Sequence, residues 1–239
     1  MSLKALYGKL LLSFGLREFE AREACKLLES ENPYLVLHRL WKAGYIVRVS
    51  RGVFRAIHPM IMAMEWAGYR WRSRISRTEY LPLLERLVVK LIEGFGEKLR
   101  SVILFGSIAS GRMRPESDID LLIVAENLPE SYSERLKLLR KMTAGVEEEA
   151  IKLWREKKIY PLIDPIILTP EEASRIQPFY LDLLENSIII YDKDGFMERI
   201  LEGLKDRLRK LRSRKVLLPN GSWYWIVKPD AKAGEVIEV

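Results

Sequence analysis

The sequence predicts an α/β (α+β) protein, in which a small mixed-sheet domain with flanking helices follows a smaller domain of helices and a hairpin. Residues 1–60 show three helical patterns and then two short β-branched or aromatic runs around a tight turn. Residues 71–193 alternate helical patterns with apolar runs of strand length. Of the 239 residues, 48% are hydrophobic, which is typical of a globular protein with a packed core.

The composition excludes several classes of protein. The longest apolar runs, such as 121–125, are far too short to span a membrane, and the N-terminus lacks the features of a signal peptide. We therefore expect a cytoplasmic protein with no membrane partner. The single cysteine, Cys25, excludes a disulfide framework and a cysteine-based zinc site. Charged residues reach 31%, with one Gln and four Asn, a balance typical of proteins from thermophiles.

The net charge of +7 is unevenly distributed. Residues 1–70 carry 11 Lys and Arg against 6 acids, and residues 205–239 carry 9 against 4. The segment between them carries 20 bases against 23 acids. Basic ends around an acidic middle suit a centre that holds divalent cations beside surfaces that meet a polyanion, and ordinary solubility charge is the alternative.

The first 70 residues form the first predicted domain. Apolar spacing predicts helices over Leu3–Phe14 and Phe19–Glu29, and Asn32-Pro33 opens a third that Gly44 closes. The runs "YIVRVS" and "VFRAI" around an Arg-Gly turn predict a hairpin. This order resembles the winged helix-turn-helix family, in which the third helix enters the major groove of DNA and the wing touches the backbone.

That resemblance supplies candidate DNA contacts. The third helix offers His38, Arg39 and Lys42 as outward polar groups, and the wing offers Arg48, Arg51 and Arg55. Winged helices also serve as docking modules for proteins or as homodimer interfaces, and this alternative stays open.

The second predicted domain spans 71–193, and a C-terminal basic helix and hairpin follow over 194–239. Thr78 is the predicted N-cap of a helix that runs to about Glu93. Further strands are predicted at 101–105, 119–124, 159–169 and 187–191, with helices at 133–157, 170–186 and 196–214. The hairpin is predicted around Pro219-Asn220-Gly221.

The stretch "SVILFGSIASGRMRPESDIDLLIV", residues 101–124, carries the chemistry. Residues two apart on a strand share a face, so Asp118 and Asp120 point the same way and Ile119 points into the core. Two neighbouring carboxylates favour a cation between them, and oxygen ligands suit Mg²⁺ that bridges a substrate phosphate. Gly106-Ser107 ends the preceding strand, where the backbone and the hydroxyl can cradle phosphate.

These residues resemble the DNA polymerase beta-like nucleotidyltransferase superfamily, whose signature is an apolar strand, Gly-Ser, a spacer of about ten residues and Asp-apolar-Asp. Ala109, Gly111 and Ser117 further resemble its minimal nucleotidyltransferase subgroup, whose members often work as antitoxins or adenylylating partners. Where that subgroup usually has Arg after the alanine, this chain has Ser110.

The resemblance implies site residues. The nucleotide-binding residues would be Gly106, Ser107, Arg112, Arg114 and Ser117. Either one of the two arginines replaces the missing one on the phosphates, or the loop binds nucleotide more weakly. Members usually carry a third carboxylate that is metal ligand and general base, for which Asp164 in "IYPLIDPIIL" is the candidate. Two prolines in that run favour an edge strand, where Asp164 could simply face solvent.

Two functions follow as expectations. The first is a nucleotidyltransferase that moves a nucleoside monophosphate, AMP from ATP, onto a hydroxyl of a protein, an RNA or a small molecule. Asp118, Asp120 and Asp164 would hold two Mg²⁺ ions, with Mn²⁺ as the alternative ion. The second is a DNA-binding regulator or antitoxin, in which the transferase fold senses a nucleotide or binds a partner toxin protein.

Overall fold

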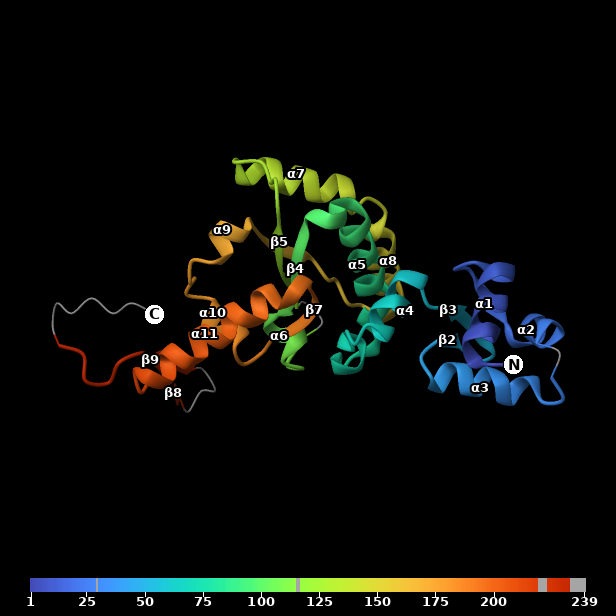
Figure 1. Ribbon diagram of the computed structural model, residues 1–239. Coiled ribbons are helices and arrows are strands. Elements are labelled where there is room, and N and C mark those ends of the chain that lie inside the picture. The colour runs from blue at the N-terminus through green and yellow to red at the C-terminus, as the bar shows by residue number, and fades with distance from the viewer. Residues whose placement is uncertain (29, 115–116, 219–222, 233–239) are drawn as a thin grey trace. The chain divides into compact units, whose positions relative to one another are not determined.

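The computed structural model describes residues 1–28, 30–114, 117–218 and 223–232 of the chain (Figure 1). The chain divides into two compact units, Met1–Tyr69 and Arg70–Val239. No helix among the described residues is both long and apolar enough to cross a membrane.

The first unit combines helices with a small antiparallel sheet in the strand order β1-β3-β2. Its elements are α1 (Leu3–Phe14), β1 (Glu18–Glu20), α2 (Ala21–Leu27), α3 (Pro33–Lys42), β2 (Ile46–Ser50), β3 (Val53–Ala56) and α4 (Pro59–Trp66). Asn32 caps α3 as expected, since its side chain accepts a hydrogen bond from the backbone N–H of Leu35 at 3.0 Å.

The predicted helices and hairpin of the first unit are present, with two differences. Phe19 was expected at the start of the second helix, but it lies in β1 opposite Phe54 of β3, because its ring is buried there. Neither β1 nor α4 was predicted. Assignment of this unit to the winged helix-turn-helix family stays a prediction.

The second unit is built on a four-stranded sheet in the order β6-β5-β4-β7. Only β6 and β5 are parallel, so the sheet is mixed, as predicted. Its strands are β4 (Leu99–Phe105), β5 (Ile119–Ala125), β6 (Ile163–Leu168) and β7 (Ile188–Asp192), and a separate ribbon comprises β8 (Arg214–Leu217) and β9 (Trp223–Ile226). The α-helices are α5 (Leu81–Phe95), α6 (Gly106–Ala109), α7 (Tyr132–Met142), α8 (Val146–Lys157), α9 (Pro170–Ala173), α10 (Tyr180–Leu183) and α11 (Phe196–Lys210). Short 3₁₀ turns lie at Trp71–Arg74, Thr78–Tyr80, Gly96–Lys98 and Lys193–Gly195.

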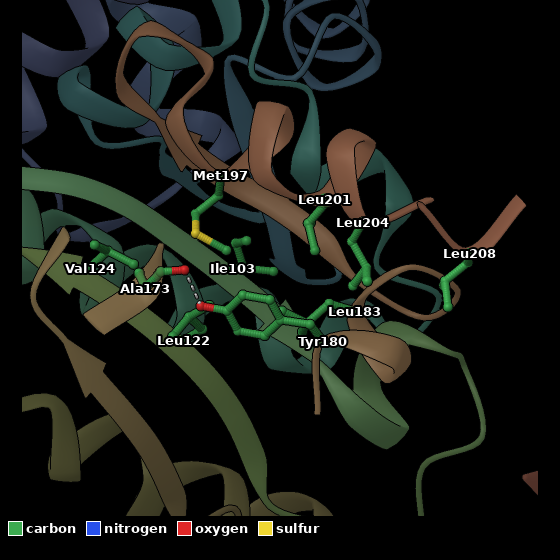
Figure 2. Packing of buried hydrophobic residues seen from close by; sticks show 10 residues of the cluster. All are labelled: Ile103, Leu122, Val124, Ala173, Tyr180, Leu183, Met197, Leu201, Leu204 and Leu208. Atoms are coloured by element: carbon green, nitrogen blue, oxygen red, sulfur yellow. Dashed lines mark hydrogen bonds between the residues drawn. The ribbon is translucent and has the colours of Figure 1, made fainter. Parts of the chain in front are cut away.

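One face of this sheet packs against the C-terminal helices. Figure 2 shows Ile103, Leu122 and Val124 of the strands with residues from α9, α10 and α11. The tyrosine of that cluster, Tyr180, donates a hydrogen bond to the carbonyl of Ala173 at 2.8 Å. Helix α11 thus shares the core of the second unit, and Trp225 of β9 also packs against that core.

Several predicted boundaries in the second unit were wrong. The strand expected over 159–169 begins only at Ile163, and the helix expected over 196–214 ends at Lys210, before β8. The helix expected over 133–157 is two helices, α7 and α8, because Gly145 between them adopts a positive φ of 86°, which interrupts the helical backbone. The helix expected over 170–186 is two single turns, α9 and α10. Thr78 starts a 3₁₀ turn and does not cap α5, whose N-cap is Tyr80. The turn predicted at 219–221 lies outside the described residues.

Side chains of α7 donate hydrogen bonds to the exposed backbone edge of strand β6. The Tyr132 hydroxyl donates to the Pro165 carbonyl at 2.8 Å, and the Arg135 guanidinium donates to the Ile167 carbonyl at 3.1 Å. Arg135 is buried and also contacts both oxygens of Glu172, at 2.6 and 3.0 Å. These contacts occupy backbone carbonyls that an edge strand would otherwise expose, and they fix the strand that carries Asp164.

Candidate active site

Two of the three predicted aspartates lie on adjacent strands, and the third, Asp118, immediately precedes β5. Asp120 of β5 lies directly opposite Asp164 of β6 in the parallel register. Residues in register on neighbouring strands share a face, so these two carboxylates project to the same side of the sheet. Asp118 stands two residues before Asp120 in the sequence, just outside β5, and its charge acts on the Asp120 carboxyl. Asp118 and Asp164 are exposed, and Asp120 is partly buried.

Asp120 experiences the repulsion that such a cluster creates. The pKa of its carboxyl is raised from 3.8 to about 6, chiefly by burial and further by the negative charges of Asp164 and Asp118. The sequence placed Asp118 and Asp120 together, and the structure adds Asp164 as the stronger source of repulsion. A bound cation would reverse this effect by favouring the charged form.

Gly106 makes room for the Asp120 carboxylate. Phe105, the last residue of β4, is paired with Asp120, and Gly106 follows with a φ of +70°. A Cβ at Gly106 would lie 1.9 Å from Oδ2 of Asp120, which no side chain could tolerate without displacing the carboxylate. The glycine is therefore required by both the backbone conformation and the space beside Asp120.

Ser107 and Ser110 close the turn that follows β4. The Ser107 carbonyl accepts hydrogen bonds from the Ser110 hydroxyl at 3.1 Å and from the Arg112 N–H at 3.0 Å. Ser110, which stands where an arginine was expected, thus stabilises the turn through its hydroxyl. The Arg112 side chain is exposed.

Ser117 closes the loop that leads into the aspartate pair. Its hydroxyl accepts from the Arg114 N–H at 2.7 Å, and its own N–H donates to the Arg114 carbonyl at 3.0 Å. The next strand is aligned by the Ile119 N–H, which donates to the Leu162 carbonyl at 2.7 Å. The Arg114 side chain is exposed. Ser117 therefore orders the backbone immediately before Asp118.

The carboxylates fit a divalent cation that is shared with a substrate. Among the described residues, no three His, Cys, Asp or Glu side chains form a group that could hold a metal ion by themselves. Mg²⁺ commonly uses only one or two carboxylates and takes its other oxygens from water and substrate phosphates. Asp118 and Asp120 offer such a pair, and a cation beside them would offset the repulsion that raises the pKa of Asp120.

A groove of about 440 Å³ lies on the other face of β6. It is lined by residues of α7, α8 and the segment 160–165, which include Ile163 and Pro165. Side chains alternate along a strand, so Asp164 between these two residues points away from the groove. The groove is therefore separate from the carboxylate cluster.

The candidate nucleic-acid contacts of the first unit lie as predicted on α3, β2 and β3 and the turn between them. His38, Arg39 and Lys42 of α3 are exposed. Lys42 Nζ lies 4.9 Å from the centroid of the Trp41 ring, and the His38 ring meets the same indole edge-on.

The wing residues differ in their exposure. Arg48 and Arg51 are exposed, whereas Arg55 is partly buried and donates to the Ala56 carbonyl at 3.4 Å. Arg55 is therefore less accessible than the other five candidates. Whether these groups bind nucleic acid stays a prediction.

Sequence reasoning missed the groups that position Asp164. Tyr132 and Arg135 hold β6, and Arg135 in turn is fixed by Glu172. The sequence did contain a signal for Glu172, because Thr169 and Glu172 have the spacing of a capping box, which they form at the start of α9. The buried Arg135 gave no such signal, since a basic residue in a charged helix normally faces solvent.

Residues 88–216 match the family described as nucleotidyltransferase domain. The chain belongs to this family. The matched segment contains all four strands of the main sheet, the three aspartates and the Gly-Ser turn, and it extends through α11 into β8. The polymerase beta-like nucleotidyltransferase resemblance is thereby confirmed at the level of the family, and the protein is an enzyme of the nucleotidyltransferase class.

A relative from Methanocaldococcus jannaschii is 34% identical over 133 residues, which cover 54% of this chain and 84% of the relative. That protein carries the provisional name of a protein adenylyltransferase.

Two solved structures are similar at lower identity. A toxin-antitoxin crystallised with AMP-PNP is 18% identical, over 53% of this chain and 90% of that chain, with a TM-score of 0.32. A nucleotidyltransferase from Sulfolobus solfataricus, also provisionally named, is 21% identical, over 52% and 86%, with a TM-score of 0.33. These scores are too low to support an argument about shared partners or substrates.

Proposed function

We propose that this nucleotidyltransferase moves AMP from ATP onto an acceptor hydroxyl, with Mg²⁺ and with release of pyrophosphate. The observation that carries the proposal is the register of Asp120 opposite Asp164, with Gly106 against the Asp120 carboxylate. This arrangement places the Gly106-Ser107 turn, which is suited to bind phosphate, beside the carboxylate oxygens, which are suited to bind a cation. Positioning and charge neutralisation provide most of the catalysis in such displacements.

The reaction assigns a task to each group. The acceptor oxygen forms a bond to the α-phosphorus as the bond to the pyrophosphate oxygen breaks, and the acceptor proton passes to the Asp164 carboxylate. The backbone and hydroxyl of Gly106-Ser107 hold the phosphates, and the exposed Arg112 and Arg114 balance their charge. When bound, Mg²⁺ neutralises the triphosphate and the departing pyrophosphate.

A protein hydroxyl is the acceptor that we favour. The relative from Methanocaldococcus jannaschii carries the name of a protein adenylyltransferase, and the chain covers most of its length. An RNA end and a small molecule are the other acceptors that the sequence left open.

The proposal is tested by thermal unfolding and by transfer of label. ATP with Mg²⁺ should raise the melting temperature clearly, and ATP with EDTA should raise it only weakly, because the aspartates repel bare triphosphate. The double variant Asp118→Asn, Asp120→Asn should lose this metal dependence and should not release pyrophosphate. If the double variant retains both, the site lies elsewhere in the chain.

The second candidate function is DNA binding by the first unit. The observation that favours it is the exposure of His38, Arg39, Lys42, Arg48 and Arg51 on α3 and the wing. Duplex DNA should bind with a steep salt dependence, and replacing Arg48 and Arg51 with Gln should lower the slope of log affinity against log salt by about 2. An unchanged slope would leave this unit as a docking module, for example for a partner toxin or a second copy of the chain.

A further inference from the structure

The second unit has a strongly basic surface that the transfer reaction does not use. Seven bases and one acid occupy residues 205–215, at the end of α11 and the start of β8. Six of these bases have exposed side chains: Lys205, Arg207, Arg209, Lys210, Arg212 and Arg214. We call this set the basic surface. The seventh base, Lys215, is partly buried, pairs with Glu185 and lies over the Trp223 ring.

The packing of α11 directs these bases outward. Leu201, Leu204 and Leu208 recur at helical spacing and point into the core, as Figure 2 shows. The bases between and after them therefore take the solvent side of the last turns. One pairs with an acid, since Arg209 lies 3.3 Å from Asp206, and both of those side chains are more than half exposed.

Stability of the helix does not account for so many bases. One or two cations in the last turn are enough to complement the helix dipole. Lys205 and Arg209 are four residues apart, a spacing at which like charges destabilise a helix. A surface that keeps this repulsion is suited to a polyanion, which relieves it on binding.

An exposed ring lies beside the charges. In the ribbon Val216 is paired with Tyr224, and Arg214 is two residues from Val216 on the same strand. Arg214 and Tyr224 therefore project from the same face of the ribbon. Both are exposed, whereas Trp223 and Trp225 are partly buried. A guanidinium beside an accessible aromatic ring is the pair that binds a phosphate and stacks on a base.

The basic surface lies toward the catalytic end of the sheet. Strand β7 is antiparallel to β4, and the turn at Lys193–Gly195 reverses the chain into α11, which contacts both strands. Helix α11 therefore runs in the same direction as β4, toward the point where Gly106 begins. Phe105 and Trp225 pack against the same core cluster, which ties the ribbon to that end of the sheet.

From this arrangement we propose that the basic surface and Tyr224 bind single-stranded nucleic acid, with the phosphates on the bases of α11 and β8 and a base on the Tyr224 ring. Guanidinium groups provide four of the six charges, and their forked donors match phosphate oxygens. This interaction is independent of the molecule that accepts AMP, so it goes beyond the proposed function. It also differs from duplex binding by the first unit in its ligand and its residues.

The test uses the full chain and fluorescently labelled single-stranded oligonucleotides, RNA and DNA, of equal length. The variant Lys205→Gln, Arg207→Gln, Lys210→Gln should lower affinity about ten-fold or more at low salt. It should also reduce the slope of log affinity against log salt by about 2, since each lost phosphate contact on a single strand accounts for about 0.7. The control variant Lys137→Gln, Lys141→Gln, Arg155→Gln changes the charge equally at exposed sites on α7 and α8, and it should bind like the wild type.

Tyr224→Ala should lower affinity about five-fold or more without changing the salt slope, because stacking is not electrostatic. Photo-crosslinking with 4-thiouridine in the RNA should label peptides within 205–226. Both variants should retain their unfolding temperatures and pyrophosphate release.

Three results would overturn the proposal. Equal losses in the Gln variant and its control would show that only net charge matters. Crosslinks confined to residues 34–55 would place the contact in the first unit. Displacement of the RNA by polyglutamate at equal charge concentration would identify the surface as a site for acidic proteins.

Discussion

Replacing Asp120 with Asn should stabilise the metal-free protein while it abolishes nucleotidyl transfer. The carboxyl of Asp120 has a pKa of about 6 in the folded chain, against an ordinary value of 3.8. A raised pKa means that the folded state disfavours the charged carboxylate. A difference of one in pKa corresponds to about 1.4 kcal/mol, so the charge destabilises the fold by about 3 kcal/mol at neutral pH.

Solvent reduces this value, because Asp120 is only partly buried, and about 1 to 3 kcal/mol is expected for Asp120→Asn. For a unit of this size, that free energy raises the melting temperature by about 3 to 8 °C. The sign follows from the direction in which the pKa moves. Below pH 3.8 the Asp120 carboxyl is protonated in the folded and the unfolded chain, and the folded state carries no penalty for its charge. As the pH rises through about 6, the carboxyl ionises in the folded state and the charge destabilises the fold. The advantage of the variant should therefore be absent near pH 4 and complete above pH 7.

The assay is thermal unfolding in EDTA from pH 4 to pH 8, followed by circular dichroism. Asp118→Asn is the matched control, since it removes an exposed carboxylate two residues away and should give a smaller gain. Addition of Mg²⁺ and ATP should stabilise the wild type and leave Asp120→Asn unchanged. The reasoning is refuted if Asp120→Asn is less stable than the wild type at pH 7.5, or if its gain persists unchanged at pH 4.

Three further predictions concern neighbouring residues. Gly106→Ala should abolish transfer and lower the free energy of unfolding by about 1 kcal/mol or more, because Gly106 has a positive φ and a Cβ there would clash with Asp120. The control Gly203→Ala has open space at its Cβ and should be neutral or stabilising in the same unfolding assay. Asp164→Asn should lower kcat by about 10² to 10⁴ with little change in ATP affinity, and full turnover would show that Asp164 is only a surface carboxylate. Glu172→Gln should destabilise the protein by about 2 to 3 kcal/mol at pH 7, because it leaves Arg135 buried beside a neutral amide. Since Arg135 lowers the pKa of Glu172, the stabilisation by the charged pair is lost as the pH falls through that lowered pKa, so the loss in the variant should shrink in acid; a loss that is constant with pH would contradict the assignment.

Local patterns predicted the proximity of Asp118 and Asp120 and most strands of this protein. The alternation of Ile119 and Asp120 depends only on the period of a strand, so the sequence predicted that Ile119 is buried and that Asp120 lies on the other face, where it is only partly buried. The predicted ends of helices were wrong where a single residue changes the direction of the backbone. At Gly145 a positive φ divides an otherwise continuous helical pattern, and a glycine in such a pattern can equally continue the helix.

The sequence by itself determined the family signature, Asp120 at the start of β5 with Asp118 just before that strand, and the apolar face of each core helix, because these depend on spacing over a few residues. Only the tertiary structure decided that Asp164 lies opposite Asp120, because a parallel register is set by packing across the long segment between the two positions and by contacts from Tyr132 and Arg135. It also decided why Gly106 is glycine. The nearest atom to its missing Cβ belongs to Asp120, which is 14 residues away in the sequence and adjacent in space because β4 and β5 are paired.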